Sequence, residues 1–128
     1  MSYEAWIRKA LRFRECAEED LRDGRYNSFA FFAQQAAEFL FKGMLIKLTG
    51  SRQLTHAVSE LLGYLGKALG RSVSEGVGRC AEALEAHYVQ ARCPDARLSG
   101  CRGWEAEEAV KCMDAVWRYV REVAGGLA

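Results

Sequence analysis

The sequence predicts an all-α fold, an antiparallel up-and-down bundle of about five helices, formed by one domain that spans residues 1–128. Every sustained apolar pattern repeats at three or four residues, the period of a helix. Pro94 is the one proline, so little interrupts these patterns. A chain of 128 residues can bury one adequate core but is too short for two.

The first two helices are delimited by a capping serine and two glycines. Ser2 is a suitable N-cap because its hydroxyl can accept a free backbone N–H of the first turn. Gly24 ends this helix, and the second runs from about Tyr26 to Leu48, with Gly50 as its stop. The second helix is expected to be central and among the longest, because its surface is almost continuously apolar. The apolar face of the first helix comprises Trp6, Ala10, Phe13, Ala17 and Leu21.

Caps and a proline delimit the remaining three helices. Thr55 is the expected cap of a third helix that ends at Gly70. Ser72-Val-Ser-Glu75 matches a capping box, and the fourth helix that follows must end before Pro94. The fifth helix has an acidic start and a basic end, as its dipole favours. The residues concerned are Glu105, Glu107, Glu108, Arg118 and Arg121.

A polar stripe interrupts the apolar surface of the second helix. Gln34, Glu38 and Lys42 fall at i, i+4 and i+8 and therefore share one side of the helix. Glu38 before Lys42 is the favourable order for an i,i+4 ion pair. Such a stripe indicates either a seam that faces a partner or a functional groove.

Composition and charge limit the classes of function. Hydrophobic residues make up 50% and charged residues 27%, which is ordinary for a soluble fold and excludes disorder. A net charge of +1 argues against strong non-specific nucleic-acid binding. No apolar run approaches the roughly 18 residues of a membrane span, and no signal-peptide core is present, so we expect a cytoplasmic protein without a membrane partner. The single asparagine and the excess of arginine over lysine hint at a thermophilic source.

The five cysteines do not have the spacing of a metal site. There is no CxxC and no Cys/His pair at ligand spacing, so no metal is expected. Cys16, Cys80 and Cys112 lie within helical patterns, and we interpret them as inert buried thiols. Cys93 and Cys101 bracket a short loop that a disulfide between them could close. This disulfide is a hypothesis, since cytosolic disulfides are rare outside hyperthermophiles.

Four segments occur in an order and at spacings that resemble a known family. They are Gln34-Gln35-Ala36-Ala37-Glu38 with Lys42, Thr55-His56, the stretch Tyr88 to Asp95, and Glu107-Glu108-Ala109. Together they resemble the HEPN family of small helical-bundle proteins over nearly the whole chain. One departure is Cys93, which stands where the family usually has tyrosine, so the contacts of that ring are lost.

The resemblance implies a partner and a ligand. HEPN proteins are often encoded beside a minimal nucleotidyltransferase and act with it, in some cases as a toxin–antitoxin pair. It therefore implies a nucleotidyltransferase-domain partner and a nucleotide or RNA ligand, bound in a partly open groove where Lys42 and Arg92 supply positive charge. The implied nucleotide- or phosphate-binding residues are Gln34, Glu38, Lys42, His56, Tyr88, Arg92 and Asp95.

Some of these residues also have a structural interpretation. His56 could support the Thr55 cap or bond a backbone carbonyl, and Arg92 could form an ion pair with Asp95 that pins the loop. In that case the stripe on the second helix would be an ordinary charged helix face.

Many HEPN proteins are metal-independent ribonucleases that carry arginine, four to six residues, then histidine. Here three residues separate Arg52 from His56, and seven separate Arg79 from His87. On a helix the latter pair would lie roughly 80° apart around the axis and ~12 Å apart along it. The nuclease motif is therefore absent, and we predict no catalytic residues and no cofactor. The alternatives are an RNA-directed endoribonuclease or toxin with displaced site residues, and a bundle that only mediates association.

The supply of large apolar side chains predicts a symmetric homodimer. The chain carries more of them than a bundle of this size readily buries. Phe31, Phe39, Tyr88 and Trp117 are expected to form a second apolar surface that a partner covers.

Overall fold

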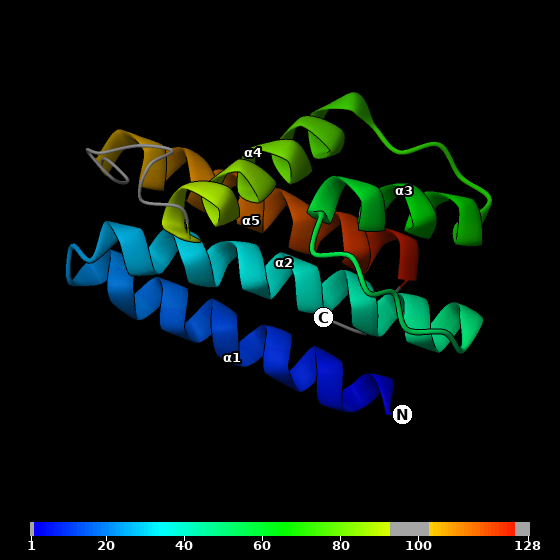
Figure 1. Cartoon of the computed structure of the whole chain (residues 1–128). Coiled ribbons are helices and arrows are strands. Elements are labelled where there is room, and N and C mark those ends of the chain that lie inside the picture. The colour runs from blue at the N-terminus through cyan, green and yellow to red at the C-terminus, as the bar shows by residue number, and fades with distance from the viewer. Residues whose placement is uncertain (1, 93–102, 125–128) are drawn as a thin grey trace.

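The computed structural model describes residues 2–92 and 103–124, with the backbone alone described for 87–92. Within these residues the chain forms five α-helices and no strand, which confirms the predicted all-α bundle (Figure 1). The helices are α1 (Tyr3–Arg22), α2 (Tyr26–Thr49), α3 (Val58–Leu69), α4 (Glu75–Arg92) and α5 (Gly103–Ala124). No helix in the described ranges is both long enough and apolar enough to span a membrane.

Helix α2 is the central element, as its apolar surface predicted. It is 24 residues long, and each of the other four helices packs against it. Figure 1 shows α1 antiparallel to α2 on one side, with α3, α4 and α5 on the other. A core of large side chains forms around it, including Phe29, Leu40, Phe41, Met44 and Leu45.

Close packing of α1 on α2 depends on Gly43. A Cβ atom at this position would lie 2.8 Å from Ile7 Cδ1 and 3.1 Å from Trp6 Cβ. Both contacts are tighter than ordinary van der Waals distances. The absence of a side chain at Gly43 therefore sets how near the two helices approach each other.

Several predicted helix ends are confirmed. The Ser2 hydroxyl accepts the backbone N–H of Ala5 at 3.4 Å and caps α1. Gly50 and Gly70 end α2 and α3 with φ of 74° and 65°, in the left-handed region that favours glycine.

The predicted Thr55 cap is wrong, because α3 begins later, at Val58. The Thr55 hydroxyl accepts the backbone N–H of Ala57 at 3.1 Å and donates to Glu60 Oε2 at 3.0 Å. Thr55 thus stabilises the turn that leads into α3. Contacts of the neighbouring His56 with α2 hold this stretch out of the helix.

The predicted capping box at Ser72 is also wrong. Helix α4 begins at Glu75, and the Ser74 hydroxyl accepts the backbone N–H of Val77 at 3.3 Å. The cap is therefore Ser74, two residues later than predicted. Glu75 consequently lies in the first position of the helix, where it cannot complete the box.

The structure corrects the interpretation of two cysteines. Cys80 on α4 and Cys112 on α5 form a disulfide, with Cα atoms 4.8 Å apart, so they are not free thiols. Cys16 is a free, half-buried thiol. Cys93 and Cys101, the pair predicted to close a loop, lie outside the described residues. The spacing along the chain gave no sign of the observed bond, because its cysteines are 32 positions apart and meet only through packing of α4 on α5.

One member of the predicted dimer surface is misplaced. Trp117 on α5 is buried in the core of the bundle, and the Arg14 guanidinium lies 4.9 Å from its ring centroid. Phe31 and Phe39 are half-buried. Phe39 packs between α2 and α1, where its ring centroid lies 4.9 Å from that of Trp6. The side chain of Tyr88 is not among those described. The homodimer itself remains a prediction.

Candidate functional site

The polar stripe on α2 is buried in the bundle. Gln34 is fully enclosed, and Glu38 and Lys42 are only 1% and 2% exposed. Lys42 Nζ lies 2.9 Å from Glu38 Oε2, so the ion pair predicted from the i,i+4 spacing is present. Either charge alone would be costly at this depth. The stripe is therefore part of an internally paired core and not a charged solvent face.

The imidazole of His56 links the buried polar stripe of α2 to the protein surface. His56 Nδ1 lies 3.0 Å from Glu38 Oε2, while 61% of the histidine side chain is exposed. In addition, Gln34 Nε2 donates to the backbone carbonyl of His56 at 3.2 Å. Figure 1 shows the segment between α2 and α3 running back beside α2. His56 is thus attached to α2 at two points, by its ring and by its carbonyl.

Gln35 completes the network, and the sequence interpretation missed it as a site residue. Its Nε2 donates to Gln34 Oε1 at 2.7 Å and to Glu38 Oε1 at 3.4 Å. Gln34 Nε2 also donates to Glu38 Oε1, at 3.0 Å. The available signal was the i,i+3 spacing of Gln35 and Glu38. We call Gln34, Gln35, Glu38, Lys42 and His56 the Glu38 cluster.

An aromatic ring and a second cation lie beside the Glu38 cluster. Lys42 Nζ is 5.9 Å from the Trp6 ring centroid, and the Arg52 guanidinium carbon is 5.2 Å from the same ring. Arg52 is exposed and stands on the same segment as His56. Contacts between a cation and an indole face are attractive. Trp6 therefore helps to hold Arg52 near the surface end of the cluster, a role that sequence reasoning did not identify.

The structure brings four of the seven predicted site residues together. Gln34, Glu38, Lys42 and His56 are linked by hydrogen bonds and ion pairs. Tyr88 and Arg92 belong to the C-terminal part of α4, but their side chains are not among those described, and Asp95 lies outside the described residues. Because Lys42 is enclosed and paired, the polar groups exposed at this edge are the His56 ring and the guanidinium of the adjacent Arg52.

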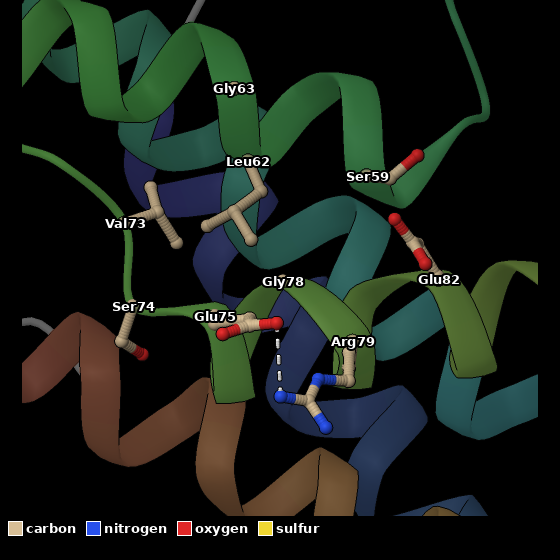
Figure 2. A pocket seen from close by; sticks show the side chains of 9 residues that line it. All are labelled: Ser59, Leu62, Gly63, Val73, Ser74, Glu75, Gly78, Arg79 and Glu82. Atoms are coloured by element: carbon tan, nitrogen blue, oxygen red, sulfur yellow. Dashed lines mark ion pairs between the residues drawn. The ribbon is translucent and has the colours of Figure 1, made fainter.

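A separate cavity of about 480 Å³ lies between α3 and the start of α4 (Figure 2). Arg79 lines it but is already paired with Glu75, at 3.1 Å. Glu82 adds a further carboxylate, and Leu62 and Val73 supply an apolar wall. This lining offers little positive charge to a phosphate. Across the described part of the chain, no group of three or more His, Cys, Asp or Glu could hold a metal ion.

A family model for the HEPN domain matches residues 3–123. The chain belongs to the HEPN family. This confirms the resemblance seen in its motifs. No curated protein matches the chain.

Two solved structures are similar to this HEPN domain over almost their full length. TT1696 from Thermus thermophilus is 30% identical, with 94% of this chain and 96% of that chain covered and a TM-score of 0.82. ST0689, an archaeal HEPN homologue, is 27% identical, with 95% and 97% covered and a TM-score of 0.75. The five-helix arrangement is therefore shared with HEPN relatives.

Proposed function

We propose that this HEPN domain is the nucleotide-binding or partner subunit of a minimal nucleotidyltransferase system. The observation that carries the proposal is the exposed His56 ring held by the buried carboxylate of Glu38, at 3.0 Å. Membership of the family supports the partnership, because HEPN proteins often act beside such an enzyme. The sequence has no Arg-x(4–6)-His pair, so we propose a binding role in place of RNA cleavage.

The energetics of the Glu38 cluster support a role beyond stability. Replacing a buried ion pair by apolar side chains of similar size is often neutral or stabilising. A fold that needed only a core could therefore place apolar residues at Glu38 and Lys42. The charges instead fix the orientation of an exposed imidazole, since the Nδ1 edge of the His56 ring faces the Glu38 carboxylate. A residue that binds a ligand needs its side chain held in one orientation by such neighbouring groups.

Arg52 supplies the charge that a nucleotide phosphate needs. Its guanidinium can donate two parallel hydrogen bonds to phosphate oxygens, which an ammonium group cannot match. Arg52 lies on the same segment as His56, and the face of the Trp6 ring holds its guanidinium in place. In the proposed complex the phosphates contact Arg52 and His56, and Arg92, Tyr88 and Asp95 contribute from α4 and the segment after it. Lys42 acts through Glu38 and does not touch the ligand.

Calorimetric titration with ATP and GTP tests nucleotide binding. Saturable binding is expected for the unmodified protein, with at least a tenfold weaker Kd in Arg52→Ala, which corresponds to about 1.4 kcal/mol. His56→Ala and Arg92→Ala should weaken binding in the same direction. Lys67→Ala is a matched control because Lys67 is an exposed cation on α3. Equal affinity in all variants would exclude the Arg52–His56 edge as the nucleotide site.

The partnership is tested by mixing the protein with a minimal nucleotidyltransferase from the same organism. A complex on size-exclusion chromatography, at a mass above either component, is the expected result. If neither a nucleoside triphosphate nor this enzyme binds, the proposed function is wrong and a bundle that only mediates self-association is favoured.

A further inference from the structure

A second cavity, which shares no residue with the Glu38 cluster, lies near the C-terminal end of α5. It encloses about 380 Å³ and is lined by the segment between α3 and α4, the first turn of α4 and the last turns of α5. This volume falls in the range of small-ligand sites. Its polar lining includes Arg71, Ser72, Arg118, Tyr119 and Glu122.

Two arginines line this cavity, and neither has a carboxylate partner among the described residues. Arg71 and Arg118 are exposed, and neither guanidinium forms an ion pair or side-chain hydrogen bond with another described residue. Other exposed cations, such as Arg8 and Arg22, also form no ion pair with a described residue, so what distinguishes Arg71 and Arg118 is that both line the same cavity. Two guanidinium groups around one cavity, neither of them paired with a described residue, repel each other and favour an anion between them.

The buried hydroxyl of Tyr119 points to the same conclusion. Tyr119 lines the cavity and is only 9% exposed, and its hydroxyl oxygen has no hydrogen-bond partner among the described residues. Leaving such a buried group without a hydrogen-bond partner destabilises the fold. Burial raises the pKa of the Tyr119 phenol, while the charge of Arg71, which lines the same cavity, acts in the opposite direction. At neutral pH the hydroxyl therefore remains protonated, and it can donate a hydrogen bond to an acceptor that enters the cavity.

We propose that this cavity binds a phosphate group, either as the free ion or as part of a small phosphate ester. Arg71 and Arg118 donate charge-assisted hydrogen bonds to its oxygens, and the Ser72 and Tyr119 hydroxyls complete the donor set. Because the Tyr119 oxygen is shielded from solvent, its contact with the phosphate requires a small shift of the lining side chains.

Glu122 sets the strength of this site. Its carboxylate lines the cavity and repels an anion, so the lining charge is one positive unit, from two arginines and one glutamate. Removal of this carboxylate should strengthen binding. That change is opposite in direction to the effect of removing an arginine, and a purely structural role of these residues would not produce it.

A ¹⁵N NMR titration of the full chain with inorganic phosphate, and separately with glycerol phosphate, tests the proposal. Saturable shifts are expected at Arg71, Arg118 and Tyr119. Arg71→Ala with Arg118→Ala should abolish them. Tyr119→Phe should weaken binding roughly 2- to 12-fold, the effect of one neutral hydrogen bond, and Glu122→Gln should tighten it. Tighter binding of glycerol phosphate would identify the ester as the ligand, and equal or weaker binding the free ion.

Arg79→Ala is the matched control, since Arg79 lines the neighbouring cavity and is already paired. Unchanged circular dichroism of each variant shows that the fold is intact. The proposal is overturned if the unmodified protein shows no saturable shift at these residues, or if the double arginine variant retains it. His56→Ala should leave the shifts unchanged, so failure here and failure of the proposed nucleotide site are distinguished.

Discussion

Glu38 and His56, 18 positions apart in the sequence, are joined by a 3.0 Å contact between a buried carboxylate oxygen and an exposed imidazole. The same carboxylate oxygen lies 2.9 Å from Lys42 Nζ in the core. Glu38 therefore connects the interior of α2 to the surface segment that precedes α3. A substitution of Lys42 in the core should consequently change the position of the His56 ring at the surface.

Replacement of Lys42 by methionine should lower the free energy of unfolding by about 3 kcal/mol, because it removes the lysine that pairs with the buried Glu38 charge and leaves that charge with the Gln34 and Gln35 amides and the His56 ring. The double variant Glu38→Leu, Lys42→Met should be more stable than Lys42→Met alone. Urea denaturation followed by circular dichroism measures both. Additive losses in the double variant would show that the two side chains do not act as a pair.

Gly43→Ala and Gly63→Ala should have opposite effects on stability. At Gly43 the new methyl group meets the fixed Cβ of Trp6 at 3.1 Å, so α1 must shift, at a cost of about 1–2 kcal/mol. At Gly63, inside α3, a Cβ meets nothing within 4 Å, so alanine should stabilise the helix by about 0.5–1 kcal/mol. Thermal unfolding of both variants checks this; equal effects would contradict the role assigned to Gly43.

Loss of the disulfide in Cys80→Ala should destabilise the oxidised protein by about 3–4 kcal/mol, from the entropy of a loop closed over 32 positions. Cys16→Ala, which removes a free half-buried thiol, should cost less than about 1 kcal/mol. Reductant should lower the melting temperature of the unmodified protein and of Cys16→Ala but have little effect on Cys80→Ala. If reductant lowered the melting temperatures of all three proteins equally, the effect would come from other cysteines.

Glu60 should contribute to the pH dependence of stability. Hydrogen bonds from the Tyr64 hydroxyl, at 2.7 Å, and from Thr55 lower the pKa of Glu60 below its ordinary value of 4.5. A lowered folded pKa gives stability that is present above pH 4.5 and is lost as the pH falls through the folded value. Tyr64→Phe should therefore raise the Glu60 pKa toward 4.5 in an NMR titration. Tyr3→Phe is the control and should leave it unchanged.

The sequence predicted what depends on neighbours along the chain. Helix existence, the Gly50 and Gly70 ends and the Glu38–Lys42 pair are set by local period and spacing, and all are present. The caps at Thr55 and Ser72 were each placed two residues too early. At Thr55 the cause is tertiary, since the bonds of His56 to α2 decide where the backbone becomes helical.

What the sequence did not predict depends on helix packing. Cys80 and Cys112 meet because α4 lies on α5, and Trp117 is buried because its face of α5 turns inward. The second-cavity residues Arg71 and Tyr119 are 48 positions apart, too far for any pattern of spacing to link them. The convergence of His56 on Glu38 was expected only through the family resemblance.

The disulfide also determines what would follow from a cut in the chain. Cys80 and Cys112 bridge α4 and α5 on either side of the connection between these helices. A protease that nicked any one peptide bond between them would leave two fragments still covalently joined. The nicked molecule would therefore keep its intact mass, apart from one added water, and would separate into two pieces only after reduction.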